Sequence, residues 1–348
     1  MSNFKVNGFK FIKALSGKGG FGLPYLFQSE KDPSQQYFVK HIHYEGLFNK
    51  LQLEAGLDAG EAEKKANDLI AKELNILELL KKEEEKSKNQ RWNFPMFHFS
   101  WIDPITNKDR LLFMEYCAKG DLYNRIQENK KNKMMFPEKE VLRIFYGVMN
   151  AVKVLHDQLK TVHRDLCSQN IMFDANDIPK LIDFGSGRII QEGRIATTYT
   201  LAHLTHYPPE TEDQNFKYSS WNLYSVDIWE MGIVLYEMMD LDLKIWKTAL
   251  LKKPKPDYSE LIQLPYSEDL KKLVMSMCAI DPNSRPQAAI LMQNALFMDI
   301  RVIYGKSFVV IFIENWRDVI KEGENSRRRK KGKSIYKFMP NNFHDLWV

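Results

Sequence analysis

The sequence has few cysteines and no long apolar run. Its 348 residues include three cysteines, Cys117, Cys167 and Cys278, and no pair of them has the spacing of metal ligands. This excludes a disulfide framework, and a reduced, cytosolic chain fits such cysteine usage best. The start of the chain, MSNFKVNGFK, lacks the apolar segment of a signal peptide. The apolar run Phe308–Ile313 is too short to span a bilayer and indicates a buried strand or helix segment.

A strong excess of charge of either sign is also absent. The formal net charge is +5, and charged residues make up 27% of the chain. This balance does not predict nucleic-acid binding, because a solvated surface explains it. The one strong block of like charge is RRRKKGK, Arg327–Lys333. It indicates a nuclear-import or anionic-surface patch or a solvated tail, so we expect a cytoplasmic protein and leave a nuclear location open.

What the sequence does contain is a change of pattern along its length. Strand-like segments, separated by turn residues, make up about the first 40 residues. Helical spacing of apolar residues follows from about Glu61 to Glu85, and the apolar run Arg110–Cys117 indicates a buried strand. Three later segments have helical periodicity: Val141–Gln158, Val226–Met239 and Tyr266–Cys278. The predicted fold class is therefore α+β, with a strand-rich first part and a larger helical second part.

A glycine-rich stretch lies between the first two strand-like segments. GKGGFG places Gly17, Gly19 and Gly22 in the spacing G-x-G-x-x-G. Glycines at such positions let backbone N–H groups close on phosphates without side chains in the way. The same spacing occurs in dinucleotide-binding folds, which need a helix after the glycines. Because strand-like residues follow here, a hairpin over nucleotide phosphates is favoured, with a plain hairpin turn as the alternative.

Two later stretches carry candidate catalytic groups. HRDLCSQN contains Asp165 and Asn170, and LIDFGSG contains Asp183. Asp183 and Asn170 offer the hard oxygen ligands that Mg²⁺ prefers, and Asp165 can accept the proton of a hydroxyl group. Together with the glycine spacing, these stretches resemble the eukaryotic-type protein kinase family, over about Phe9–Met298. The resemblance implies ATP and Mg²⁺ as cofactors and a protein as the substrate.

The resemblance gives the matching residues expected roles. Lys40 in YFVK resembles the lysine that holds the α- and β-phosphates, and Glu73 resembles the helix glutamate that pairs with it, with Glu78 as an alternative. The residues expected in catalysis are Asp165, Lys40 and Asn170. The residues expected to hold Mg²⁺ are Asn170 and Asp183. The motif DIWEMG resembles the start of the helix under the catalytic loop, and Arg285 matches the arginine that pairs with Glu210 of PPE.

The resemblance also implies two lobes with ATP between them. A small sheet-rich lobe would span 9–115 and a helical lobe 116–298, followed by an extension, 299–348, with the basic tail. The hinge would lie at Glu115 and Cys117, with Met114 at the back pocket and Asp121 near the ribose. The residues expected to bind the cofactor are Gly17, Gly19, Gly22, Lys40, Glu73, Glu115, Cys117 and Asp121. The segment 46–68 is longer than usual and is expected to extend the helix region, as a docking surface or only as a longer helix.

Several positions depart from the pattern of the family. Cys167 stands where serine/threonine kinases have a lysine that touches the transferring phosphate, and Gln169 weakens a preference for basic peptides. Phe38 and Pro24 replace small residues that pack on the adenine, so Phe38 could crowd the ring or stack on it. In the segment before Glu210, the departures are His203 and His206.

These observations predict an ATP-dependent protein kinase that acts on serine or threonine, with tyrosine not excluded. The alternatives are a pseudokinase scaffold and a small-molecule kinase; the motif DIWEMG and the Glu210–Arg285 match argue against the latter. Arg164 further predicts regulation by a phosphate on the segment before Glu210, with Arg188 and Arg194 as additional donors. The candidate acceptors are Thr197, Thr198, Tyr199 and Thr200. Nothing in the sequence predicts the oligomeric state.

Overall fold

The computed structural model describes most of the first 300 residues. The described ranges are 6–15, 22–86, 93–190, 208–212, 220–241 and 258–300. The chain divides into one compact unit, Met1–Met298, and a second, Asp299–Val348. The apolar run Phe308–Ile313 and the basic block Arg327–Lys333 lie outside the described residues.

The N-terminal part of the first unit is built on a five-stranded antiparallel sheet. Its strands are β1 (Phe9–Ala14), β2 (Leu23–Ser29), β3 (Gln36–Ile42), β4 (Phe97–Ile102) and β5 (Arg110–Glu115). Their order in the sheet is β1-β2-β3-β5-β4. They are rich in phenylalanine, tyrosine, valine and isoleucine, which favour pleated, half-buried surfaces. The register places Lys40 opposite Pro24 on one side and Leu112 on the other.

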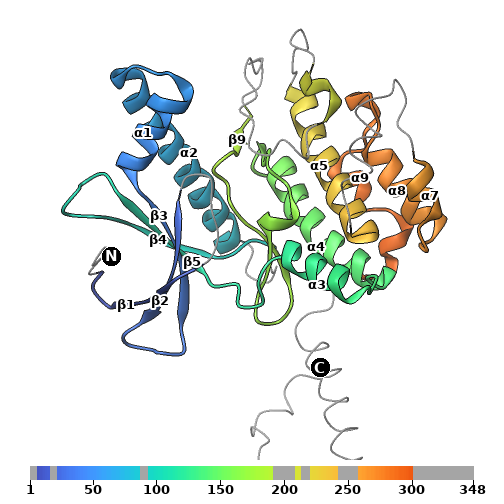
Figure 1. Cartoon of the computed structure of the whole chain (residues 1–348), viewed down its shortest axis with the longest axis horizontal. Coiled ribbons are helices and arrows are strands. Elements are labelled where there is room, and N and C mark those ends of the chain that lie inside the picture. Colours follow the sequence, from blue (N-terminus) through green and yellow to red (C-terminus); the bar gives the residue numbers. More distant parts are fainter. Residues whose placement is uncertain are drawn as a thin grey trace, which may run out of the picture. The chain divides into compact units, whose positions relative to one another are not determined.

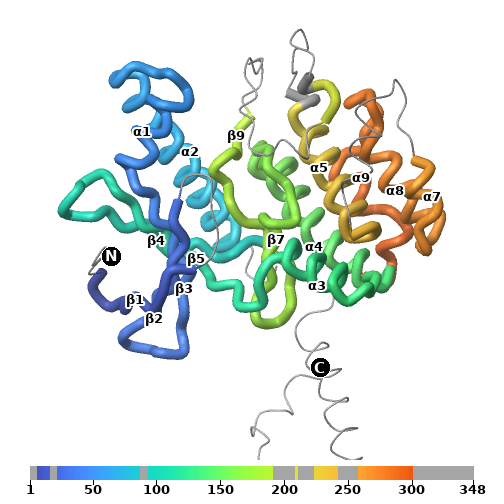
Figure 2. The backbone as a smooth tube through the Cα atoms, in the orientation of Figure 1, coloured from blue at the N-terminus to red at the C-terminus, as the bar shows by residue number. Residues whose placement is uncertain are grey.

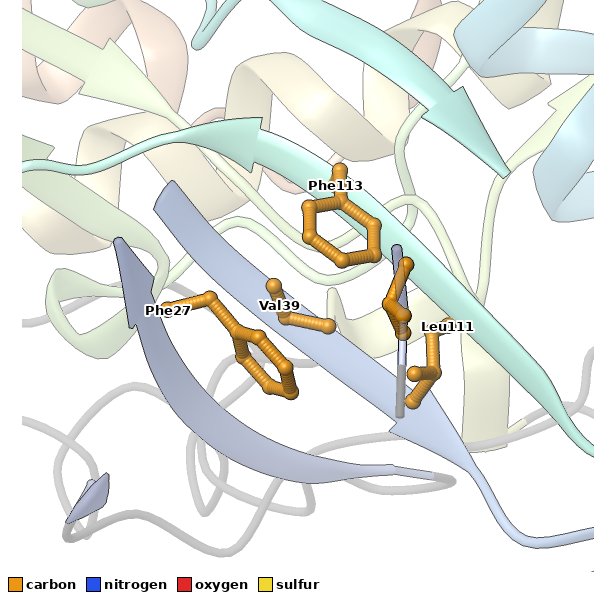
Figure 3. Packing of buried hydrophobic residues seen from close by; sticks show 5 residues of the cluster. Phe27, Val39, Leu111 and Phe113 are labelled. Atoms are coloured by element: carbon orange, nitrogen blue, oxygen red, sulfur yellow. The ribbon is translucent and has the colours of Figure 1, made fainter. Parts of the chain in front are cut away.

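One face of this sheet carries its own apolar core. Phe27, Val39, Leu111 and Phe113 are fully buried there, and Figure 3 shows their side chains gathered on the strands. Successive side chains of a strand point to opposite faces. Phe38 and Lys40 therefore lie on the other face, which is the face available for a functional site.

Two helices follow the third strand. α1 (Tyr44–Ala55) begins at His43, whose Nδ1 accepts a hydrogen bond from the backbone N–H of Gly46 at 3.1 Å, and ends at Gly56 in the left-handed conformation. α2 (Ala59–Lys86) then runs along the sheet (Figure 1). The segment 46–68 thus does not form one longer helix, because Gly56 reverses the chain and a separate helix packs on α2.

The second part of the unit is mostly helical. Its helices are α3 (Leu122–Asn132), α4 (Glu138–Asp157), α5 (Ser220–Asp240), α7 (Ser259–Gln263), α8 (Glu268–Met277) and α9 (Ala288–Leu291). Short 3₁₀ helices lie at Ser168–Asn170, Pro209–Glu212, Pro282–Ser284 and Ala295–Phe297. α4 buries a stripe at three- and four-residue spacing and packs against α5 and α9. Figure 1 shows these helices gathered on one side and the sheet on the other.

Four short strands lie between the sheet and the helices. They are β6 (Thr161–Val162), β7 (Ile171–Phe173), β8 (Pro179–Leu181) and β9 (Arg188–Ile189), paired as β6 with β9 and β7 with β8. The tube in Figure 2 shows the segment of β7 next to α3, and its partner strand β8 packs on α4. This arrangement confirms the predicted α+β class with a small sheet and a larger helical part. Among the described helices, none has the length and apolar character needed to cross a membrane.

Candidate active site

The structure brings the candidate phosphate-binding lysine between two carboxylates. Lys40 Nζ lies 2.6 Å from Oε1 of Glu73 on α2 and 2.8 Å from Oδ1 of Asp183. Glu73 faces inward because it shares the buried stripe of α2 with Ile70, Ile76 and Leu77. Glu78, the alternative partner, is exposed on the same helix. The sheet, the helix and the segment after β8 therefore meet at one ammonium group.

The charges at this meeting point determine its protonation states. Burial alone would lower the pKa of Lys40, but the charges of Asp183 and Glu73 outweigh it and raise that pKa. Burial raises the pKa of Glu73, and Lys40 only partly offsets it. Burial also opposes the charge on Asp183, yet Lys40 and the N–H of Gly185 hold its pKa below the usual value. Lys40 is therefore protonated and positively charged, and Asp183 keeps its negative charge more readily than Glu73 does.

The candidate base lies beside the candidate metal ligands. The amide Nδ2 of Asn170 donates to the backbone oxygen of Asp165 at 2.8 Å and to its Oδ2 at 3.0 Å. Asp165 is 9% exposed. Burial, followed by the charge of Asp183, raises its pKa to about 7. A carboxyl group with this pKa is suited to accept a proton near neutral pH.

Two residues of the site adopt a backbone conformation that is rare for residues with side chains. Arg164 has φ of 66° and Asp183 has φ of 62°, both in the left-handed region. Residues other than glycine adopt this region at an energetic cost and only where the surroundings enforce it. Such conformations cluster at functional sites, and here they occur at Arg164, next to Asp165, and at Asp183 itself.

Helix α5 holds the loop His163–Asn170, called the catalytic loop here, through hydrogen bonds to its backbone. Asp227 accepts hydrogen bonds from the backbone N–H of His163 at 2.9 Å and of Arg164 at 2.8 Å, and from Nε2 of His156 at 2.8 Å. One turn further on, Oε2 of Glu230 accepts the backbone N–H of Leu166 at 2.9 Å. The loop that carries Asp165 is therefore held through its backbone.

A second ion pair ties the segment before α5 to the C-terminal helices. Arg285 donates from Nη1 and Nη2 to the two carboxylate oxygens of Glu210, each at 2.7 Å. The guanidinium also lies over the ring of Trp229, 4.8 Å from its centroid. The pair that the motifs indicated is thus a buried bidentate contact, the strongest geometry available to arginine.

Of the other residues expected to bind the cofactor, Glu115 and Asp121 have side-chain partners within the protein, and Cys117 is buried. Glu115 accepts Lys180 Nζ at 3.1 Å and the N–H of Met96 at 3.2 Å. Cys117 is buried, and burial raises the pKa of its thiol to about 12. Asp121 begins α3 as its N-cap, with Oδ1 accepting the N–H of Asn124 at 2.7 Å and Oδ2 the side-chain amide at 2.9 Å. Asp121 therefore has a structural role of its own, which its capping position before Leu122 could have revealed.

The structure describes only part of the glycine-rich stretch and of the positions that depart from the family pattern. Gly17 and Gly19 lie outside the described residues, as do His203, His206 and the four candidate acceptors. A Cβ at Gly22 would lie 2.7 Å from Cγ of Lys40, so glycine there leaves room for the lysine. Phe38 is half-buried, on the same face as Lys40, and pairs with Met114 of β5.

Sequence reasoning missed two buried polar residues, Glu230 on α5 and His156 on α4. Both are polar residues at positions that helical periodicity marks as buried. A polar residue on a buried helix face must find a partner, and for Glu230 that signal was available in DIWEMG. The partner of Glu230 is the N–H of Leu166 in the catalytic loop, and the partner of His156 is Asp227 on α5; periodicity places neither partner.

Comparison with known proteins identifies the family. The family model described as "Protein kinase domain" matches residues 13–297. The chain belongs to the protein kinase family, which confirms the resemblance drawn from its motifs. Members of this family are transferases.

Curated relatives place the chain near one group of these kinases. It is 26% identical over 81% of its length to the probable serine/threonine-protein kinase nek2 of Dictyostelium discoideum, covering 60% of that protein. It is 33% identical over 52% of its length to serine/threonine-protein kinase Nek3 of Mus musculus, covering 34%. It is 29% identical over 81% of its length to serine/threonine-protein kinase Nek5 of Homo sapiens, covering 35%. The chain thus spans less than two thirds of the length of each of these relatives.

Proposed function

We propose that this chain is an active protein kinase that transfers the γ-phosphate of ATP to a serine or threonine hydroxyl of a protein. The observation that carries the proposal is the pair of contacts from Lys40 to Glu73 and Asp183, with Asp165 and Asn170 beside them. Phosphoryl transfer depends mainly on positioning and on neutralisation of charge. The serine/threonine assignment rests on the names of the relatives.

The donor set fits Mg²⁺ and a nucleotide. Mg²⁺ in such sites uses one or two carboxylates and takes its other ligands from water and phosphates. In the described part of the chain, no cluster of three or more His, Cys, Asp or Glu side chains could hold a metal by itself. Asp183 and Asn170 would hold the cation, which would neutralise charge on the phosphates. Lys40 would contact phosphate oxygens, with Glu73 keeping it in place.

Asp165 would take the proton of the acceptor hydroxyl. Its pKa of about 7 leaves the carboxylate available at and above neutral pH. The hydrogen bond from Asn170 to Oδ2 fixes the direction of that carboxylate. Residues of this chain would therefore bind the nucleotide, orient the acceptor hydroxyl and take its proton, and the reaction needs all three.

The competing function is a scaffold that binds nucleotide without efficient transfer, and Cys167 is the observation that favours it. The test is incubation of the full chain with Mg–ATP and a generic protein substrate, followed by mass spectrometry of phosphopeptides. We expect phosphoserine or phosphothreonine in the wild type and none with Asp183→Asn. ATP binding by calorimetry without any phosphopeptide would favour the scaffold, and phosphotyrosine would correct the acceptor class.

Phosphorylation of the segment before Glu210 is proposed as the regulator. Three cations approach each other where a phosphate could bind: Lys72 of α2, Arg164 and Arg188 of β9. Burial lowers the pKa of Lys72, and the charges of Lys65, Arg188 and Arg164 lower it further. Burial and the charge of Arg164 lower the pKa of Arg188. A phosphate carries roughly −1.5 to −2 charge and would relieve this repulsion. The candidate acceptors lie outside the described residues.

A cytoplasmic or nuclear location is proposed on the cysteine usage and the basic block Arg327–Lys333. Full-length and 1–320 fusions to a fluorescent reporter test the tail. Nuclear signal that falls on truncation would support an import patch, and an unchanged, even distribution would support a solvated tail.

A further inference from the structure

Helix α5 presents a row of buried acids to the catalytic loop. Asp227, Glu230 and Glu237 are 0%, 2% and 6% exposed. At 100° per residue, their spacing places all three on one face of the helix. Buried carboxylates are costly unless they are hydrogen-bonded, so each of them needs a partner on this face.

The partners are consecutive parts of one loop. Asp227 takes the backbone N–H of His163 and Arg164, and Glu230 takes the N–H of Leu166 at 2.9 Å. Glu237 lies beside the hydroxyl of Ser168, whose hydrogen bond partly offsets the effect of burial on its pKa. Of these contacts, only the one to Glu230 comes from the peptide bond that directly follows Asp165. Leu166 is fully buried, so water cannot replace the acceptor.

Glu230 does not need its charge for this contact. Burial raises its pKa well above the usual value, the charges of Asp227 and Asp165 raise it further, and the N–H of Leu166 and the charge of Arg164 partly offset this. The groups that face it are thus two acids and one arginine. A neutral carboxylic acid keeps a carbonyl oxygen that accepts a hydrogen bond, so the backbone contact is maintained in the protonated form.

We propose that Glu230 is a positioning residue of phosphoryl transfer, which fixes the backbone of the catalytic loop next to Asp165. The inference rests on the proposed kinase activity and deepens it. Asp165 is held at its side chain by Asn170 and at the following peptide by Glu230. Without the second contact, the buried N–H of Leu166 loses its acceptor, and the loop must move to satisfy it.

Three substitutions of Glu230 distinguish the effect of its hydrogen-bond acceptor from the effect of its charge. Glu230→Gln keeps the length and an acceptor oxygen, whereas Glu230→Met keeps the length and removes the acceptor. Glu230→Asp keeps the carboxyl group but is one methylene shorter, so its oxygens lie farther from the N–H of Leu166. We expect kcat to fall roughly 10- to 100-fold with Glu230→Met and Glu230→Asp, the scale of a small misplacement of a catalytic group. We expect Glu230→Gln to stay near wild type, and KM for ATP to change little in all three.

Hydrogen exchange of the peptide that contains Leu166, measured by mass spectrometry without nucleotide, provides a readout that needs no activity. Exchange should be faster in Glu230→Met and Glu230→Asp and slow in Glu230→Gln. If the wild type transfers no phosphate, the proposed function fails, while this exchange pattern still decides whether Glu230 holds the loop.

The inference is overturned by wild-type kcat in both acceptor-withdrawing variants, or by Glu230→Gln being as impaired as Glu230→Met. It is also overturned if exchange quickens equally over the whole chain, because Glu230 would then serve stability alone. If Glu230→Met does not fold, Glu230→Asp decides the question by the same measurements.

Discussion

Asp165 is buried at a cost to stability, so removal of its charge should stabilise the protein while lowering its activity. Burial, followed by the charge of Asp183, raises its pKa from 3.8 to about 7. The hydrogen bond from Asn170 and the charge of Lys40 offset only part of this. Asp165→Asn keeps the shape and an acceptor oxygen for Asn170 but removes the charge. We expect a variant with strongly reduced activity that is more stable than the wild type at neutral pH.

The sign and size of the effect follow from the pKa. A group whose pKa is higher in the folded chain contributes stability below its unfolded pKa and loses it as the pH rises through the folded value. For Asp165 this window runs from 3.8 to about 7. With 1.36 kcal/mol for each pKa unit, ionisation costs about 4 kcal/mol of unfolding free energy above the window and about 2 kcal/mol near pH 5.5.

Urea unfolding at about pH 5.5 and about pH 8, with EDTA and no nucleotide, measures this difference. The stability advantage of Asp165→Asn should be about 2 kcal/mol larger at the higher pH. Asp157→Asn, which removes an exposed carboxylate at the end of α4, is the matched control and should show a small difference at both values. Loss of the general base should lower phosphoryl transfer by roughly 100-fold or more. A variant that is less stable than wild type at the higher pH would refute the reasoning.

Three further predictions concern the metal ligand, the adenine face and regulation. Asp183→Asn should lower phosphoryl transfer at least ~100-fold, and wild-type turnover in that variant would contradict the kinase assignment. Phe38→Ala should weaken ATP binding roughly 2- to 10-fold in calorimetry if the ring stacks on the base, whereas tighter binding would show crowding and an unchanged Kd would show that the ring points away. Replacement of all four candidate acceptors by alanine should lower activity and remove the phosphopeptide of that segment, and full activity would show that no phosphate is needed there. The four acceptors are Thr197, Thr198, Tyr199 and Thr200.

The order of the motifs and the periodicity of apolar residues were enough to predict the fold class and the main helices. The strand-rich and helix-rich parts were anticipated because their apolar residues alternate or recur at helical spacing. The helix α2 extends from Ala59 to Lys86, close to the predicted Glu61–Glu85. Glu73 was preferred to Glu78 from the motif, and its place on the buried face of α2 gives that preference a physical reason.

Other features depend on contacts that a linear pattern does not contain. The side chain of Glu115 turns to Lys180, and Asp121 caps a helix, because each finds a partner brought close only by folding. The segment 46–68 divides at Gly56, where a left-handed residue ends α1. The acceptor role of Glu230 requires the catalytic loop to lie on α5.

Cys167 stands where related kinases have a lysine, and we expect this replacement to lower the rate of phosphoryl transfer rather than the affinity for nucleotide. Its thiol is buried and burial raises its pKa, so this side chain is neutral where the related lysine would be charged. The contacts of Lys40 with Glu73 and Asp183 do not involve that position and remain intact. Loss of one preorganised donor lowers turnover by roughly 100- to 1000-fold, while contacts made equally in the ground state are kept. For the active kinase proposed above, the loss at Cys167 should therefore lower kcat and leave the contacts of Lys40 unchanged.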